Sequence, residues 1–395
     1  MEKIRFALLG AGSRARVLAK TLMDDPKKQG DLIALCDINE KALQQEEKAV
    51  HSLLGHSTVN YTNYLDALDN PDVDCVIIAT PDQFHHPMAI DAFRKKKHVF
   101  LEKPVGINLQ QMVDIVSAAK NSGKIMEIGY VLRYSPFFCE MKKMIDSNDL
   151  GRILFVNALE EFYGGANVYW RGWWRKRANI GGIMLQKISH DLDLAYWLFG
   201  VPKKIIAFEN NMEFHPGNWD SVAAKCSECQ NHCPYYMQAT PFKQDQCVYN
   251  TDKTGADIAD NAQVLVQFES GLNFSLGMNF FPAKAQDDRH WRIVGSKAEL
   301  TGRLSEQNLR FDPRHDLSGN KSVIYETAPP LGMGHGGGDQ IQLLEFMTAL
   351  HEKKEAKAGL ASAYWSSIMV MGAQLSADSG QVVSIKDLIS KYPFP

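Results

Sequence analysis

The sequence lacks the features that would place the protein in or on a membrane. No apolar run approaches the roughly 20 residues that a membrane-spanning helix needs. The N-terminus passes from Lys3 and Arg5 into a strand-like segment, without the apolar stretch and small-residue cleavage site of a signal peptide. We therefore expect no membrane partner and a cytoplasmic location.

A strong charge imbalance is also absent. The formal net charge is −3 and no long basic run occurs, so a nucleic acid is not an expected partner. An apolar content of 45% and a charged content of 23% are typical of a soluble globular protein. At 395 residues the chain is longer than a domain with a single hydrophobic core usually is, which favours two domains.

Cysteine is sparse, and four of the seven cysteines are bunched. The bunched residues are Cys226, Cys229, Cys233 and Cys247. Four thiolates could close a structural zinc site, because four protein ligands would leave no open position. His232 is a possible substitute ligand, Pro234 after a cysteine also occurs in iron–sulfur sites, and a reduced loop without metal is the remaining alternative. The bunching argues against a disulfide framework.

A glycine-rich turn near the N-terminus has the pattern of a dinucleotide-binding site. It lies between a strand-like run at residues 4–9 and a helical pattern that continues to residue 23, and it reads Gly10-Ala11-Gly12-Ser13-Arg14-Ala15. Gly10 would permit the tight turn, and Gly12 would let a pyrophosphate approach a helix N-terminus that favours anions. We predict cofactor-binding roles for Gly10, Gly12, Ser13 and Arg14.

An acidic residue favours NAD over NADP. Residues 32–36 are predicted to form the second strand, and Asp37 follows it about 20–25 residues beyond the turn. A carboxylate there would bind the ribose 2′-OH and repel a 2′-phosphate.

Two polar clusters follow two further predicted strands, residues 75–79 and 98–101. With a fifth strand at residues 125–129 and helices such as residues 109–122, these strands predict a doubly wound parallel sheet, whose ligands collect beyond the carboxyl ends. The clusters are Thr80-Pro81-Asp82 and Glu102-Lys103-Pro104. The Lys103 ammonium could hydrogen-bond a substrate hydroxyl and stabilise charge as its proton leaves. A solvated lysine at a strand end is the alternative.

The pattern changes after about residue 150. Strands are predicted at residues 153–162, 204–209 and 290–300, with a hairpin at residues 261–281 that turns at Glu269-Ser270-Gly271. Such strands favour a mostly antiparallel sheet with one face covered by helices. The other face could join a homo-oligomer. Residues 361–376 are predicted to be helical.

Residues 181–193 are predicted to form a helix that carries an acid–base group. In an α-helix Gln186, His190 and Asp193 would share one polar stripe, opposite an apolar stripe that includes Ile188 and Leu192. An imidazole one turn from a carboxylate is a usable acid–base arrangement at neutral pH. A histidine buried against its helix neighbours is the alternative.

Two further segments could border a site. Trp174 and Arg175, in an aromatic and basic cluster at residues 170–175, suit a sugar ring or a carboxylate, or else an ordinary interface. In His335-Gly336-Gly337-Gly338-Asp339, we predict that Asp339 caps a helix, with Gln342 completing a capping box. His335 and the glycines would form a loop at the site.

Together these motifs resemble the Gfo/Idh/MocA oxidoreductase family over nearly the whole chain. The matching segments are Gly10-x-Gly12, Asp37, Ala79-Thr80-Pro81-Asp82 with His85, Glu102-Lys103-Pro104, Gly129-Tyr130 with Arg133, Trp174-Arg175, Gly181-Gly182 and His190-x-x-Asp193. The resemblance implies a Rossmann domain at residues 1–127. It also implies an α+β domain with a large open sheet at residues 128–395, here with a cysteine-containing insertion at about residues 213–258.

The resemblance further implies NAD(P)-dependent chemistry on sugars, polyols or their relatives, with Lys103 and His190 in the active site. The residues expected at the cofactor then include Thr80, Pro81, Asp82, His85, Glu102, Lys103 and Arg133. Those expected at the substrate are Trp174, Arg175, Gln186, Lys187, Asp193 and His335. The family often has an aspartate where this chain has Gln186, beside Lys187, which suggests a substrate outside the inositol-dehydrogenase pattern.

Three functions are compatible with these residues. In the first, an NAD-dependent sugar or polyol dehydrogenase, His190 takes the hydroxyl proton while Lys103 polarises the oxygen. The second is a glycoside hydrolase or lyase that oxidises one ring carbon transiently and then eliminates the leaving group. The third is a non-catalytic NAD or sugar sensor. Accumulation of NADH separates the first from the second, and the presence of both Lys103 and His190 counts against the third.

Overall fold

The computed structural model describes residues 3–219, 223–229, 233–237, 245–283, 287–315, 321–327 and 334–395, so His232 lies outside the described residues. The chain divides into two compact units, which are described separately here. The first unit contains Met1–Cys139, Pro329–Ile368 and Ile389–Pro395, and the second contains Glu140–Ala328 and Met369–Leu388. Two segments from late in the sequence therefore belong to the first unit.

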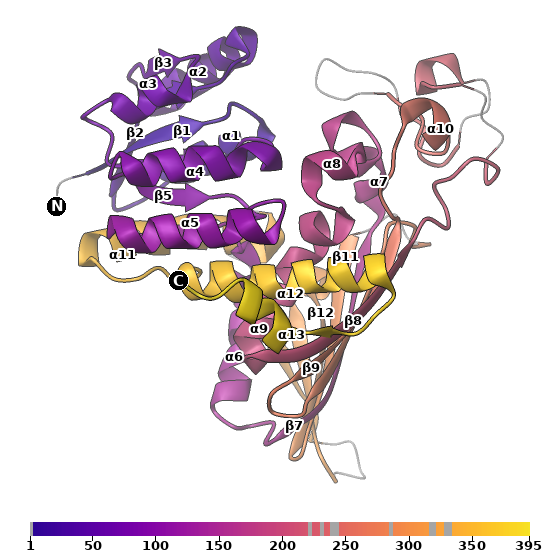
Figure 1. The fold of residues 1–395 in the computed structure, drawn as a ribbon. Helices are drawn as coiled ribbons and strands as arrows, with labels where there is room; N and C mark the ends of the chain where they lie inside the picture. Colours follow the sequence, from indigo (N-terminus) through magenta and orange to yellow (C-terminus); the bar gives the residue numbers. More distant parts are fainter. Residues whose placement is uncertain are drawn as a thin grey trace. The chain divides into compact units, whose positions relative to one another are not determined.

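The first unit is built on a six-stranded parallel sheet (Figure 1). Its strands are β1 (Ile4–Leu9), β2 (Gly30–Cys36), β3 (Val59–Tyr61), β4 (Cys75–Ile78), β5 (His98–Leu101) and β6 (Met126–Ile128). The order β3-β2-β1-β4-β5-β6 is that of a doubly wound dinucleotide-binding sheet, which confirms the predicted fold class. Only β3 was not predicted, because its three residues are too short for a clear pattern and lie at the sheet edge.

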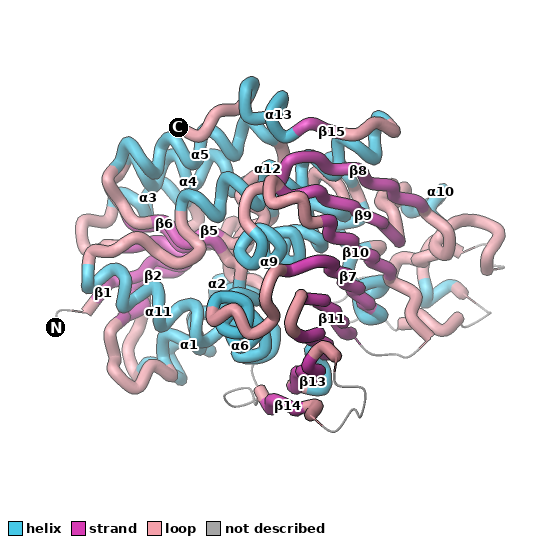
Figure 2. Tube along the Cα trace, turned by 90° about the horizontal axis from the view of Figure 1, so that it is seen from below, coloured by secondary structure: helices cyan, strands magenta, loops and turns pink. Residues whose placement is uncertain are grey.

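Helices pack along this sheet. They are α1 (Ser13–Met23), α2 (Glu40–Leu54), α3 (Tyr64–Asp69), α4 (His85–Arg94), α5 (Leu109–Ser122) and α11 (Gly338–Glu352). Although α11 comes from late in the chain, it lies beside α1 (Figure 2). The Phe346 ring of α11 packs edge-on against Phe100 of β5, with ring centroids 5.7 Å apart. Helix α11 thus completes the core of the first unit.

The second unit is built on a nine-stranded sheet in the order β14-β13-β12-β11-β7-β10-β9-β8-β15. Figure 2 shows β8, β9, β10 and β7 side by side. The strands are β7 (Ile153–Phe162), β8 (Pro202–Asn210), β9 (Asn261–Phe268), β10 (Asn273–Asn279), β11 (Asp287–Gly295), β12 (Ala298–Arg303), β13 (Asn308–Pro313), β14 (Val323–Glu326) and β15 (Val383–Ser384). Only the β7–β10 pair is parallel among the described pairs, so the predicted mostly antiparallel sheet is confirmed.

One predicted strand of this sheet is wrong in extent. Residues 290–300 were predicted as one strand, but they span the end of β11, a turn and the start of β12. At Gly295 a Cβ atom would lie 2.0 Å from the carbonyl oxygen of Leu150, so the chain turns where only glycine fits. The predicted β9–β10 hairpin is confirmed.

Two helices pack against one face of this sheet, which is called its inner face here. In α9 (Ser189–Phe199), the Phe199 ring lies 5.8 Å from Phe268 and 6.3 Å from Phe274. In α12 (Leu360–Ser379), the Ser376 hydroxyl accepts a hydrogen bond from the backbone N–H of Ala207 at 3.0 Å. The cysteine-containing segment connects β8 to β9 and includes the short helix α10 (Thr251–Thr254). Within the described ranges, every helix is too short or too polar to span a membrane.

Candidate active site

The glycine turn of the first unit leaves a helix N-terminus open. Gly10 has a φ of +101°, and a Cβ atom there would lie 2.7 Å from the carbonyl oxygen of Ala79, so only glycine lets β1 turn beside the end of β4. Gly12 is the N-cap of α1 and, as a glycine, has no side chain that could cap the first-turn N–H groups. A Cβ atom at Gly12 would meet no described atom within 4 Å. Open space before uncapped N–H groups fits a pyrophosphate.

Asp37 is joined directly to this turn. One of its carboxylate oxygens accepts a hydrogen bond from the backbone N–H of Ala11 at 2.7 Å, and the other accepts one from Asn39 at 2.8 Å. The carboxylate therefore lies at the carboxyl end of β2 next to the glycine turn. This is the place that a ribose-binding acid requires.

Arg14, in the first turn of α1, pairs with two carboxylates. Its guanidinium donates to Glu102, at the end of β5, and to Asp339 of α11. Both carboxylates are buried, whereas the Arg14 side chain keeps 26% of its surface exposed. The His335 imidazole lies 3.0 Å from the second oxygen of Asp339. Two residues predicted from sequence, Arg14 and His335, thus contact Asp339, whose importance the sequence did not reveal.

The predicted capping box at Asp339 is wrong. The N-cap of α11 is Gly337, and the Gln342 side-chain amide donates to Glu127 and to the carbonyl oxygen of Ile128, at 2.6 Å each. Asp339 instead forms an ion pair with Arg14. Burial opposes its ionisation, but His335 and Arg14 outweigh that cost and hold the pKa of the Asp339 carboxyl well below its usual range.

The two polar clusters at the carboxyl ends of β4 and β5 are tied together by His85. Its imidazole nitrogens lie 2.7 Å from the carbonyl oxygen of Pro104 and 3.0 Å from that of Thr80. The ring is buried, and burial lowers the pKa of His85, although the hydrogen bonds to the two carbonyl oxygens oppose the change. His85 therefore fixes the two loops relative to each other.

Lys103 is half-buried at the end of β5 and interacts electrostatically with Asp82, whose pKa departs from its usual value. Burial raises the pKa of Asp82 to about 7, while Lys103 lowers it and Glu102 raises it further. Arg133 lies buried in the single turn that follows β6 (Val131–Tyr134). The predicted cofactor-side residues of the first unit thus all lie at the carboxyl ends of its strands or in the loops and helix starts that follow them.

In the second unit, the predicted helix around His190 is not a continuous α-helix. Met184–Ile188 form a π-helical turn, and α9 begins only at Ser189. Because a π turn bonds i to i+5, the spacing that placed Gln186 and His190 on one α-helical stripe does not apply. Residues 182–195 are also all buried, so neither stripe of the predicted helix faces solvent. A π turn inside a helix is frequently found at a functional site.

Buried charges surround this turn. Lys187 lies 3.0 Å from a carboxylate oxygen of Glu160 and 3.4 Å from the centre of the Phe162 ring. Burial lowers the pKa of Lys187, although Glu160 opposes the change. Arg289 also pairs with Glu160, and with Asp191 at 3.0 Å. Glu160, Asp191 and Arg289 were not identified from sequence, because they lie on separate elements with no local motif.

The aromatic residues of the second unit form a connected cluster. Trp173 and Trp174 are stacked with ring centroids 4.6 Å apart, and Trp174 meets Tyr169 edge-on at 6.4 Å. Tyr169 in turn contacts Phe162, and the Lys187 ammonium lies over the Phe162 ring. Arg175 donates to the backbone carbonyls of Thr254 and Gly172, so it anchors neighbouring loops.

The four bunched cysteines gather around one another but do not form a recognisable metal centre. None is in a disulfide bond, and the Cys226 sulfur accepts a hydrogen bond from Arg171 at 3.3 Å. Burial raises the pKa of Cys233, and the other three thiols raise it further. Over the described ranges, no group of three or more Cys, His, Asp or Glu side chains has an arrangement that could hold a metal ion. The predicted zinc site is therefore not supported.

Comparison with known proteins agrees with this architecture. Residues 4–130 match the oxidoreductase family with an NAD-binding Rossmann fold, and residues 138–301 match the GFO/IDH/MocA C-terminal domain. The protein is thus an NAD-dependent oxidoreductase. It belongs to the Gfo/Idh/MocA family, as the sequence motifs predicted.

One of the similar proteins aligns with most of the chain, and others align with about half of it. YteT of Bacillus subtilis (strain 168) is 23% identical over 389 residues, covering 87% of this chain and 88% of YteT. The scyllo-inositol 2-dehydrogenase (NAD(+)) of the same organism is 27% identical over 199 residues, or 50% of this chain and 55% of that protein. A levoglucosan dehydrogenase, solved with NADH and levoglucosan, has a TM-score of 0.79 at 17% identity, covering 97% of this chain and all of that one. This last likeness shows a shared fold.

Proposed function

We propose that the protein is an NAD-dependent dehydrogenase that oxidises a CH–OH group of a sugar, a polyol or a related carbohydrate. The carboxyl edge of the first sheet carries this proposal, because an uncapped helix N-terminus, Asp37 and Lys103 all lie along it. The inositol and levoglucosan dehydrogenases among the similar proteins support the substrate class.

In this proposal the chain's own residues bind, orient and move a proton, while NAD, when bound, supplies the hydride acceptor. The N–H groups at Gly12 hold the pyrophosphate, and Asp37 accepts from the ribose. Lys103 donates a hydrogen bond to the substrate hydroxyl and stabilises the developing alkoxide. His190 accepts the hydroxyl proton. Trp174 would contact the sugar ring, whereas Arg175 is already engaged by backbone carbonyls.

A substrate panel tests the proposal. Purified protein with NAD is incubated with sugars, polyols and glycosides, and both NADH absorbance and products are followed. We expect NADH to accumulate with at least one sugar or polyol. Release of an aglycone without NADH would instead indicate glycoside cleavage by transient oxidation, and NAD binding with no reaction anywhere in the panel would indicate a sensor.

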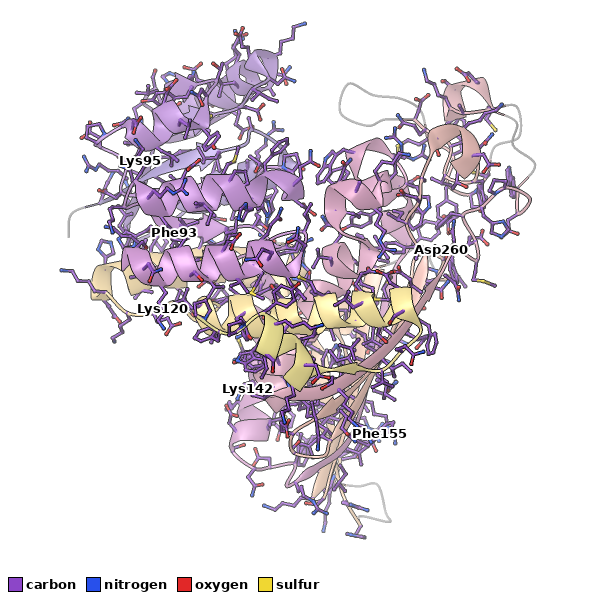
Figure 3. The ribbon with its side chains drawn as sticks, in the orientation of Figure 1. Phe93, Lys95, Lys120, Lys142, Phe155 and Asp260 are labelled. Atoms are coloured by element: carbon purple, nitrogen blue, oxygen red, sulfur yellow. The ribbon has the colours of Figure 1, made fainter. Side chains whose placement is uncertain are left out.

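We further propose that the outer face of the nine-stranded sheet joins two copies of the chain. Phe208 of β8, Leu265 of β9 and Phe155 of β7 are 57%, 46% and 46% exposed and point to this same face (Figure 3 labels Phe155). Covering such side chains is favourable at about 25 cal/mol per Å². Light scattering should give an oligomer for the native chain and a smaller species for Phe208→Glu. A monomeric native chain would refute this.

A further inference from the structure

A closed cluster of four charged side chains includes Asp191, the residue that follows His190 in α9. Glu160 of β7 and Arg289 of β11 are cross-strand partners, and both face the helix that carries Lys187 and Asp191. One Glu160 oxygen, Oε1, accepts from both Lys187 and Arg289, and Asp191 Oδ1 accepts from the Nε of Arg289 at 3.0 Å. None of the four side chains is more than 9% exposed.

The two acids of the cluster each have one oxygen without a donor. Within the described residues, Glu160 Oε2 and Asp191 Oδ2 are buried and receive no hydrogen bond. Arg289 bridges the two carboxyl groups, and a hydrogen bond between them contributes to the pKa shift of each. Two ionised carboxylates can only accept, so such a contact requires a proton on one of them.

We propose that Glu160 and Asp191 share one proton at neutral pH and so form a buried carboxylic acid–carboxylate pair next to His190. Like charges in a shared site push one proton affinity up and the other down. The surrounding groups favour Asp191 as the protonated member, because Glu160 contacts two cations and Asp191 only one. The pair titrates as a unit.

The electrostatics agree with this assignment. Burial raises the pKa of Asp191 to about 7, with Arg289 opposing and Glu160 adding to the rise. Burial also opposes ionisation of Glu160, but Arg289 and Lys187 outweigh it and lower its pKa. The other facing groups are Lys187 from the π turn, Arg289 from β11, and Tyr169 of the short helix Ala166–Tyr169, which interacts with Arg289.

The shared proton sets the charge beside the proposed base. Lys187, Arg289 and Glu160 together carry one net positive charge while Asp191 is protonated, and the cluster becomes neutral when the proton leaves. A nearby positive charge disfavours the imidazolium form. Asp191 and Glu160 would thus be positioning residues that keep His190 neutral and able to accept a proton. This consequence, unlike the proton itself, rests on the proposed function.

Infrared difference spectroscopy tests the shared proton without any substrate. At pH 6 the full-length protein should show a carboxylic-acid C=O band that titrates near neutral pH and that Asp191→Asn lacks. Glu160→Gln should remove the same band, because the glutamine amide would donate the hydrogen bond that the shared proton otherwise makes. This second variant tests the proposal if Asp191→Asn does not fold. Glu127→Gln, which alters a buried acid of the other unit whose pKa is also about 7, is the matched control: it should remove its own acid band and leave the band assigned to Asp191 in place. Persistence of the band in both Asp191→Asn and Glu160→Gln would overturn the proposal.

The consequence for His190 has a separate readout. If the protein oxidises a sugar or polyol, the pH profile of kcat/KM should lose one ionisation near neutral pH in Asp191→Asn. An unchanged profile in a variant that has lost the band would refute the link to His190. Failure of every substrate would count against the proposed function alone, because the infrared result does not depend on turnover.

Discussion

Glu127 should make the stability of the first unit depend on pH. It lies wholly buried on β6 and accepts hydrogen bonds from the Tyr134 hydroxyl and the Gln342 amide, both at 2.6 Å, and from the Ala358 N–H at 3.3 Å. Burial outweighs these bonds and raises the pKa of Glu127 from 4.5 to about 7. The native state therefore keeps a proton that the unfolded chain releases between these values.

The sign and size of the effect follow from the raised pKa. Stability associated with the proton is fully present below pH 4.5 and is lost as pH rises through 7. A shift of roughly 2.5 pKa units corresponds to about 3 kcal/mol at most. Glu127→Gln resembles the protonated acid and should remove this contribution.

Denaturant unfolding between pH 5 and pH 8 measures the effect. The free energy of unfolding of the native chain should fall by about 2–3 kcal/mol more than that of Glu127→Gln over this range. Taking the difference between the two proteins cancels the titration of Asp82 and Asp191, whose pKa values also lie at about 7. Parallel pH dependence in the two proteins would refute the argument.

Two other variants test the cofactor side of the first unit. Asp339→Ala removes a buried partner of Arg14, and we expect the free energy of unfolding, measured with denaturant, to fall by about 1–3 kcal/mol. This is less than the usual cost of breaking a wholly buried pair, because the Arg14 side chain is 26% exposed. A fall of under about 0.5 kcal/mol would contradict the pairing. Asp37→Ser should weaken NAD binding about tenfold, through loss of a charged hydrogen bond, and improve NADP binding. Calorimetric titration with both cofactors measures this, and an unchanged preference would remove Asp37 from cofactor choice.

The parallel sheet could be predicted from sequence because its signals are local. Strands β1 and β5 are short apolar runs with the predicted bounds, and the turn between β1 and α1 has a glycine pattern with a direct physical cause. The contribution of α11 to this unit could not be predicted, because a helix 330 residues along the chain carries no mark of the sheet it covers. Asp339 was missed for the same reason, since helix capping explained it locally.

The second unit's site shows where sequence reasoning fails. His190 and Lys187 could be singled out, but the π turn that contains Lys187 has no sequence pattern that separates it from an α-helix. Glu160 and Arg289 are paired only by the register of two strands that are distant in sequence. The cysteine spacing was compatible with zinc, whereas the described side chains do not form a site for it. Spacing alone does not fix the direction of a side chain.

Lys103→Ala provides the most direct test of the proposed reaction. The variant is compared with the native chain on the best substrate of the panel by NADH absorbance, and NAD affinity is measured by calorimetry. Lys95→Ala, which alters an exposed lysine of the same unit that pairs with Asp69, is the control (Figure 3 labels Lys95). We predict that Lys103→Ala lowers kcat about 10²–10⁴-fold while NAD still binds and Lys95→Ala stays at the native rate. Native turnover in Lys103→Ala would contradict the proposed role of this lysine.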